Sequence, residues 1–212
     1  MSQSKKTQSR VVGLVLNGGH STRMGRPKGE VIYHGVSFLE HAIRCLQQTT
    51  IEQLYVGLKD KKPIQGENND TSRSTLLSRE NIQLCYDEFG DKGPVGGILS
   101  AIEHAELQVG DILLVIPNDM PKLRSQYLEA LLEHARCKLQ SCYFESNYFP
   151  VAFYLSNENI ALLKTVKSAN SVSMRYVLSG AISISLNDLQ GKGLKVSRDD
   201  FHNINSPDML SM

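Results

Sequence analysis

The chain has little that would direct it to a membrane, to nucleic acid or to a disulfide-bonded fold. Its 23 Lys and Arg residues nearly balance 22 Asp and Glu residues, and a net charge of +1 argues against broad binding to nucleic acid or membrane surfaces. No apolar run reaches the roughly 18 residues that a membrane span requires. The polar stretch 1–10 lacks the apolar centre of a secretory signal. We therefore expect a flexible tail at 1–10 and a cytoplasmic protein that binds neither nucleic acid nor membranes.

Cysteine and histidine are too few and too scattered to predict a disulfide framework or a zinc site. The four cysteines are Cys45, Cys85, Cys137 and Cys142, and no histidine cluster accompanies the nearest pair. Reduced thiols are the expected state of such cysteines in a cytosolic protein. None of the six histidines is assigned to a metal.

What the chain does contain is an alternation of apolar runs and amphipathic stretches. Short apolar or β-branched runs predict strands, and helical spacing of apolar residues predicts helices. The expected strands are 11–16, 54–58, 82–87 and 111–116, and the expected helices are 37–48, 96–105 and 124–139. This order predicts a three-layer α/β/α fold on a mostly parallel, Rossmann-like sheet, with a small β excursion.

The remainder of the chain is less regular. It predicts two short strands or a hairpin at 141–155, helices at 157–166 and 171–178, and a strand at 181–186. The polar stretch 59–81 predicts a surface excursion with one short helix. With no internal repeat and no linker, we expect a single domain that spans 11–212.

Three unusual segments follow the predicted strands. They are the loop within 15–30, Asp87 with the glycine-rich segment 93–97, and the segment 117–121 around Asp119. Because the carboxyl ends of parallel strands meet at one edge of a sheet, we expect these segments to share a ligand site there.

The first loop combines glycines with cations. Gly18 and Gly19 permit backbone conformations in which N–H groups face an anion. Arg23, Arg26 and Lys28 add positive charge that suits a polyphosphate. Neither the P-loop spacing G-x-x-x-x-G-K-[ST] nor the dinucleotide pattern G-x-G-x-x-G is present. The loop is therefore either a phosphate-binding segment or a turn with solvated cations.

The two carboxylates at strand ends each allow two interpretations. Asp119 lies between two prolines, where it would either hold Mg²⁺ together with substrate phosphates or cap the helix that follows. Asp87 would either accept hydrogen bonds from a nucleotide or cap a turn. The glycines of 93–97 indicate the close approach of a ligand or a tight entry into a helix.

Taken together, the motifs resemble those of the MobA-like nucleotidyltransferases. The stretch 16–28, L-N-G-G-H-S-T-R-M-G-R-P-K, resembles the opening motif L-x-G-G-x-S-x-R-M-G-x-x-K of that family. The segments 93–97, 117–121 and 201–207 resemble its G-P-(aliphatic)-(small)-G, P-x-D-x-P and F-x-N-x-N-T-P segments. Within the family the chain is most similar to the molybdenum cofactor guanylyltransferases, because G-P-V-G-G favours the guanylyl branch over the cytidylyl branch.

The resemblance implies Mg²⁺-dependent transfer of GMP from GTP to molybdopterin on a nucleotide-diphospho-sugar transferase fold. The nucleotide-binding residues that it implies are Leu16, Asn17, Gly18, Gly19, Lys28, Asp87 and Asp119. The catalytic residues are Arg23, Lys28 and Asp119, with Asp119 as the metal ligand, and the acceptor-binding residues are Asn203 and Asn205. The domain then divides into a nucleotide-binding half, 11–121, and an acceptor-binding half, 122–212. Other molybdenum cofactor biosynthesis proteins are candidate partners.

Several positions depart from the pattern of the family. Asn17 replaces Ala, Asn118 replaces Cys, Ser206 replaces Thr, and Gly57 stands where a polar nucleotide contact is common. A cytidylyltransferase, a sugar-phosphate nucleotidyltransferase and a non-catalytic nucleotide-binding regulator are the alternatives on the same fold. A pure binder requires no groups that act only in the transition state, so the presence of both catalytic charges favours an enzyme.

Overall fold

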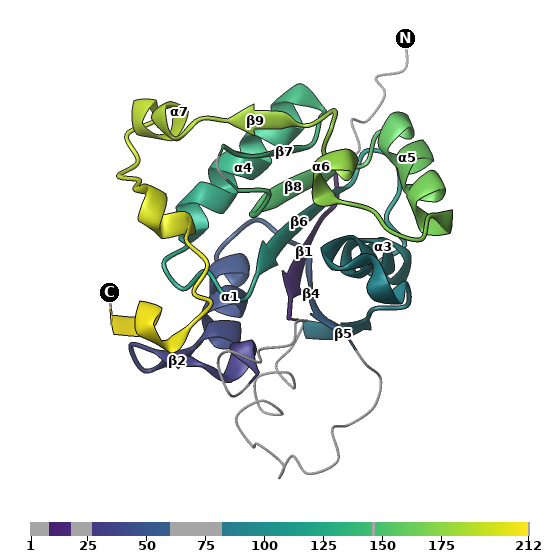
Figure 1. Ribbon diagram of the computed structural model, residues 1–212. Helices are drawn as coiled ribbons and strands as arrows, with labels where there is room; N and C mark the ends of the chain where they lie inside the picture. Colours follow the sequence, from purple (N-terminus) through teal and green to yellow (C-terminus); the bar gives the residue numbers. More distant parts are fainter. Residues whose placement is uncertain (1–8, 18–26, 60–81, 146, 212) are drawn as a thin grey trace, which may run out of the picture.

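The sheet at the centre of the molecule is mostly parallel, as the order of predicted elements requires. The computed structural model describes residues 9–17, 27–59, 82–145 and 147–211, and its main sheet has seven strands in the order β5-β4-β1-β6-β8-β7-β9 (Figure 1). Among the described strands of this sheet, β8 alone runs against the others. The bounds are β1 Val11–Leu16, β4 Gln53–Leu58, β5 Ile82–Tyr86, β6 Ile112–Pro117, β7 Cys142–Phe144, β8 Val151–Tyr154 and β9 Ile182–Ile184.

Helices cover both faces of this sheet (Figure 1). One face carries α1 (Phe38–Gln47), α4 (Ser125–Lys138) and α7 (Leu186–Gly191), and the other carries α3 (Pro94–His104), α5 (Asn157–Ser168) and α6 (Met174–Val177). Strand β6 explains the two layers, since its apolar side chains enter both cores and are fully buried in each. A strand that is apolar on both sides requires cover on both. The predicted three-layer α/β/α fold is confirmed.

Serine caps fix where several of the helices begin. The hydroxyls of Ser37, Ser156, Ser173 and Ser185 accept hydrogen bonds from backbone N–H groups in the first turns of α1, α5, α6 and α7. Each such cap contributes roughly 1 kcal/mol. Helix α3 begins at Pro94 rather than at the predicted 96, because a proline in the first turn loses no helical hydrogen bond.

The later part of the chain is partly as predicted. Strands β7 and β8 pair antiparallel, which confirms the hairpin within 141–155. The helix expected at 171–178 is only the short α6, and the strand expected at 181–186 ends at Ile184. Helix α7 follows it on a capping box between Ser185 and Asp188, and the apolar pattern does not indicate it. The predicted excursion at 59–81 falls, from 60 onward, outside the described residues.

A small third cluster joins distant parts of the chain. Val31 and Phe38, which flank the two-stranded sheet of β2 (Ile32–Tyr33) and β3 (Val36–Ser37), pack against Ile204. The C-terminal segment therefore lies beside β2 (Figure 1). Short 3₁₀ helices occur at η1 Lys28–Glu30, η2 Gly90–Lys92, η3 Arg198–Phe201 and η4 Pro207–Ser211. None of the described helices is long and apolar enough to cross a lipid bilayer.

Candidate nucleotidyltransfer site

Backbone pairing brings the predicted segments to one edge of the sheet. One residue beyond the strands, the N–H of Asn17 donates to the carbonyl of Gly57 (3.1 Å), and the N–H of Asn118 donates to the carbonyl of Leu16 (3.2 Å). The N–H of Asp87 donates in the same way to the carbonyl of Leu58 (2.8 Å). The ends of β1, β4, β5 and β6 are thus joined side by side, and Asn17, Asp87 and Asp119 follow β1, β5 and β6 within two residues.

Lys28 and Asp119 form the central charged pair of this edge. The Nζ atom of Lys28 lies 2.8 Å from Oδ2 of Asp119, although the two residues are 91 positions apart in sequence. The side chain of Asp119 is only 8% exposed and that of Lys28 is 23% exposed, so the pair is shielded from water on the aspartate side. Lys28 also donates a hydrogen bond to Oδ1 of Asn205. The Lys28 ammonium group therefore contacts two other predicted site residues, Asp119 and Asn205.

The second carboxylate oxygen of Asp119 is the strongest indication of a ligand. Oδ1 is buried and has no hydrogen-bond partner within the described part of the chain. A buried acceptor without a partner costs about 1–3 kcal/mol, and more when it is charged, so a cation at this atom would be favourable. Helix α4 begins six positions later with Arg124 as its cap residue, so the alternative interpretation of Asp119 as a helix cap is wrong.

A magnesium ion fits this environment. Among the described residues, no group of three or more His, Cys, Asp and Glu side chains could hold a metal. Mg²⁺ commonly takes one or two carboxylates and completes its shell with water and substrate phosphates. A single buried aspartate with an unpartnered oxygen is sufficient for that arrangement.

The two unusual asparagines of the site contact each other. Nδ2 of Asn118 donates to Oδ1 of Asn17 at 2.5 Å, across the ends of β6 and β1. The Cα of Gly29 packs directly over this pair, and a Cβ at that position would overlap Oδ1 of Asn17. Gly29 is the central residue of η1, so the amide pair lies under the turn that carries Lys28. The two departures from the family pattern therefore form one contact.

Asp87 caps a turn and also borders a helix start. Its Oδ1 accepts a hydrogen bond from the N–H of Phe89 at 3.0 Å, so one oxygen of Asp87 caps this turn. Both carboxylate oxygens lie against Gly96, within 2.8 Å of the position that a Cβ would take. Glycine at 96 is therefore what lets the carboxylate lie against the first turn of α3, and the tight helix entry is confirmed.

The predicted acceptor residues lie in a C-terminal arm, which we define as residues 194–206. The N–H of Ile204 donates to the carbonyl of Asp119 at 2.9 Å, so this arm pairs with the backbone of the metal candidate itself. Asn205 contacts Lys28, and Oδ1 of Asn203 is buried with no hydrogen-bond partner among the described residues. Asn203 and Asn205 therefore flank the arm residue, Ile204, whose N–H pairs with Asp119.

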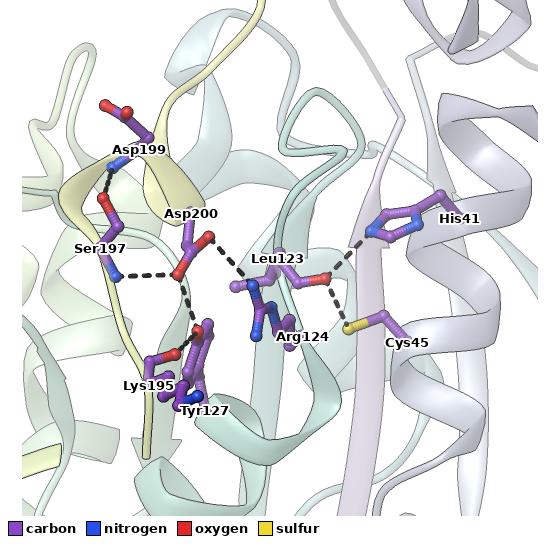
Figure 2. A network of polar contacts seen from close by, with 9 residues as sticks. All are labelled: His41, Cys45, Leu123, Arg124, Tyr127, Lys195, Ser197, Asp199 and Asp200. Carbon is purple, nitrogen blue, oxygen red and sulfur yellow. Dashed lines mark hydrogen bonds and ion pairs between the residues drawn. The ribbon is translucent and has the colours of Figure 1, made fainter. Parts of the chain in front are cut away.

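Two sets of side chains hold the segment between Asp119 and α4 (Figure 2). On the α1 side, Nε2 of His41 lies 3.0 Å and Sγ of Cys45 lies 3.6 Å from the carbonyl oxygen of Leu123. Burial lowers the pKa of His41, so its neutral ring donates to that carbonyl, and burial raises the pKa of Cys45 to about 12. On the other side, Arg124 and Tyr127 face the carboxylate of Asp200.

Some predicted residues cannot be placed. Gly18, Gly19 and Arg23 lie outside the described residues, so the structure does not show their position relative to the pair. Conversely, the sequence gives no indication of Tyr127. The spacing of Ser197 and Asp200, S-x-x-D, is a capping signal that could have indicated η3.

Comparison with known proteins identifies the family of the chain. Residues 13–181 match the family described as MobA-like NTP transferase domain. A relative from Flavobacterium johnsoniae named "Probable molybdenum cofactor guanylyltransferase" is 26% identical in an alignment over 203 residues that covers 93% of each chain. A relative of the same name from Bacillus anthracis is 28% identical over 125 residues, which cover 59% of this chain and 56% of that protein.

Solved structures share the fold at lower identity. Molybdopterin-guanine dinucleotide biosynthesis protein A from Archaeoglobus fulgidus has a TM-score of 0.68 at 21% identity, over 94% of this chain and 95% of that one. The 4-diphosphocytidyl-2C-methyl-D-erythritolsynthase from Anaerococcus prevotii also has a TM-score of 0.68, at 9% identity, over 96% and 94%. Proteins named for different nucleotides share this architecture, so fold alone does not select the base. Because the family match covers most of the described sheet, from within β1 to the residue before β9, the chain belongs to the MobA-like NTP transferase domain family and is a nucleotidyltransferase.

Proposed function

We propose that this chain transfers GMP from GTP to molybdopterin with the aid of Mg²⁺, which yields molybdopterin guanine dinucleotide and pyrophosphate. The observation that carries the proposal is the contact of Lys28 with Asp119, whose second oxygen is buried and lacks a described partner. A fixed cation and a metal-binding carboxylate are the charges that nucleotidyl transfer requires. The relatives named as molybdenum cofactor guanylyltransferases support GTP and molybdopterin as the substrates.

The reaction is an in-line displacement at phosphorus. An oxygen of the terminal phosphate of molybdopterin forms a bond to the α-phosphorus of GTP. The bond from that phosphorus to the oxygen bridging the α- and β-phosphates breaks, and the electron pair leaves with pyrophosphate. A phosphate oxygen is already nucleophilic, so no general base is required. Positioning and neutralisation of charge supply the rate.

The residues at the strand ends divide this task. Lys28 stabilises negative charge on the α-phosphate and on the leaving pyrophosphate. Asp119 holds the metal, which when bound supplies a Lewis acid for phosphate oxygens. The backbone of 16–19 binds the phosphates, Asp87 binds the guanine ribonucleoside, and Arg23 adds charge or braces the loop.

The acceptor side of the proposal rests on the C-terminal arm. Asn203 and Asn205 bind molybdopterin, and their amides flank the backbone contact between Ile204 and Asp119. Under this proposal 11–121 is the nucleotide-binding half and 122–212 is the acceptor-binding half. We also propose a cytoplasmic location, with other molybdenum cofactor biosynthesis proteins as partners.

Pyrophosphate release tests the proposal. The protein with Mg²⁺ is supplied with GTP, CTP, ATP or UTP, each with and without molybdopterin. Release only with GTP and molybdopterin together is the expected result. Release with CTP instead would identify a cytidylyltransferase. Release when a sugar phosphate replaces molybdopterin would identify a sugar-phosphate nucleotidyltransferase. Binding of GTP, seen as a raised unfolding temperature, without release under any condition would indicate a regulator.

A further inference from the structure

The C-terminal arm is fixed at two places, and one of them is remote from the strand ends. Near the strand ends it contacts the backbone of Asp119 and the side chain of Lys28. At the other place it packs on α4 through Asp200, where it meets the fully buried ring of Tyr127 (Figure 2). The remote contact precedes Asn203 and Asn205 closely in sequence, so its geometry constrains where their amides lie.

The Tyr127 hydroxyl, with its single proton, faces two acceptors of the arm. Its oxygen lies 2.7 Å from Oδ2 of Asp200 and 2.8 Å from the carbonyl oxygen of Lys195. Burial, with a further contribution from the Asp200 carboxylate, raises the pKa of Tyr127 to about 12. The hydroxyl therefore keeps its proton and remains a donor near both acceptors. A hydrogen bond to a charged group is among the stronger side-chain contacts.

Asp200 is the arm's own part of this contact. The residue is only 7% exposed, and its Oδ2 also accepts a hydrogen bond from the N–H of Ser197 at 2.9 Å, which closes the first turn of η3. Its Oδ1 lies 3.8 Å from Nη2 of Arg124, the cap residue of α4. Burying a carboxylate is costly unless its oxygens are paired, so these contacts favour one position for the arm.

Apolar and amide contacts also fix the next residue of the arm, Phe201. The ring of Phe201 packs against Tyr127 with centroids 5.3 Å apart and against Phe144 at 5.0 Å. Nδ2 of Asn147, in the turn between β7 and β8, donates to the carbonyl of Phe201 at 2.9 Å. From Phe201 the arm runs directly to Asn203, whose buried Oδ1 lacks a partner among the described residues.

We propose that Tyr127 and Asp200 are positioning residues for acceptor recognition: their contact sets the arm so that Asn203 and Asn205 meet the acceptor beside Asp119. Neither residue touches substrate. The inference rests on the proposed function, since it assigns the arm to the acceptor rather than to the nucleotide. A merely structural contact would affect folding stability without separating the two substrates.

The test uses variants that keep the shape of the side chains. Tyr127→Phe removes one hydroxyl, and Asp200→Asn removes the charge. Tyr55→Phe is the matched control, because Tyr55 is also buried but lies in β4, away from the arm. For each full-length variant, pyrophosphate release is measured against molybdopterin at saturating GTP, and GTP binding is measured separately without acceptor. Hydrogen exchange is followed in peptides that cover 200–206.

Both variants of the contact are expected to raise the KM for molybdopterin about tenfold, with kcat and the Kd for GTP within about twofold of the wild type. Amide exchange in 200–206 should accelerate in these variants and remain unchanged in Tyr55→Phe. Unchanged exchange and unchanged KM would overturn the proposal, and so would an equal loss of GTP affinity. If the wild type releases no pyrophosphate with molybdopterin but exchange responds as expected, the positioning contact stands and the proposed acceptor is wrong.

Discussion

The strand ends of the parallel half of the sheet and the C-terminal arm place their polar residues by different means. In the parallel half, Asn17, Asp87 and Asn118 are positioned by backbone hydrogen bonds that continue the ladders of β1, β4, β5 and β6. In the arm, the residues before Asn203 are held mainly by side chains, such as Asp200 with its partner Tyr127 on α4, and we propose that this contact sets the positions of Asn203 and Asn205. Backbone pairing tolerates many side chains, whereas a contact between two particular side chains does not.

This difference predicts different consequences of substitution. Changes in side chains at the strand ends should affect chemistry or nucleotide binding while the ladder keeps its register. Changes in the contacts of the arm should move the arm itself. The pair of Lys28 and Asp119 lies where the two regions meet, because Asn205 and Ile204 both contact it.

The largest effect is expected at that meeting point. Asp119→Ala and Lys28→Ala should each lower the rate of pyrophosphate release by more than about tenfold, since the loss of one preorganised charge contact in a water-excluded site costs a few kcal/mol. Asp119→Asn, which keeps the shape, should lose activity as well. Steady-state kinetics with saturating GTP and Mg²⁺ measures the effect.

The matched control lies at the opposite end of β6. Asp111 is a partly buried carboxylate that accepts hydrogen bonds from the N–H groups of Arg10 (3.3 Å) and Gln108 (2.9 Å). Asp111→Asn should reduce stability and leave the transfer rate within about twofold of the wild type. Equal losses from Asp111→Asn and Asp119→Asn would contradict a chemical role for Asp119.

The next effect tests the close approach of Asp87 to α3. Gly96→Ala would place a methyl group within 2.8 Å of both carboxylate oxygens, so Asp87 must shift. Overpacking of this kind costs about 1–3 kcal/mol, and we expect the Kd for GTP to rise about tenfold. Gly180→Ala is the control, since a methyl group at that position would have nothing within 4 Å among the described residues. An unchanged Kd for GTP in Gly96→Ala would contradict a role for Asp87 in nucleotide binding.

The contact between Asn17 and Asn118 tests whether a contact between two side chains also contributes to stability at the strand ends. Asn118→Ala removes the donor to Asn17 and leaves a polar atom under Gly29. Asn118→Ala and Asn17→Ala should each lower the free energy of unfolding by about 1–2 kcal/mol. The double variant should lower it by less than the sum of the two. Urea unfolding of the four proteins measures the coupling.

A distant amide serves as the control for that cycle. Asn159 in α5 donates to Oγ of Ser141 (3.1 Å) and to the carbonyl of Tyr154 (2.7 Å). Asn159→Ala combined with Asn118→Ala should give an additive loss. Additivity in the Asn17 and Asn118 cycle as well would mean that their contact contributes nothing.

How much of this could be predicted from sequence follows the same division. The shared edge of Asn17, Asp87 and Asp119 could be predicted because parallel strands bring their carboxyl ends to one edge of a sheet once the strands are recognised. The strands position these residues through backbone pairing, and apolar runs in the sequence predict the strands.

The contact of Tyr127 with Asp200 could not be predicted in this way. The two residues are 73 positions apart, and an amphipathic helix predicts only that a tyrosine faces inward. The S-x-x-D spacing at 197–200 indicates a local turn but not its partner. Helix α7 could not be predicted for a related reason, since six residues are too few to establish a helical period.

The smallest effect concerns His41, which supports the segment after Asp119. Burial lowers its pKa, so the unfolded chain binds more protons than the folded one at mildly acidic pH. Its contribution to stability is complete above about pH 6.5 and is lost as the pH falls further. The free energy of unfolding of the wild type should decrease as the pH falls from 8 to 5. That of His41→Gln should decrease less steeply over the same range.

Cys45→Ala is the control for the pH effect. Cys45 contacts the same carbonyl of Leu123, but its pKa of about 12 lies outside the range. This variant should shift stability by the same amount at every pH from 5 to 8. Parallel curves for His41→Gln and the wild type would contradict the assignment of acid sensitivity to His41.

Transfer of a labelled α-phosphate tests the central claim most directly. GTP labelled at the α-phosphate is mixed with the protein, Mg²⁺ and molybdopterin, and the products are separated. The account predicts that the label appears in a dinucleotide joined to molybdopterin, that CTP labelled in the same way gives none, and that Asp119→Asn gives at most about a tenth of the wild-type yield. Retention of the label in GTP, or an equal yield from Asp119→Asn, would contradict it.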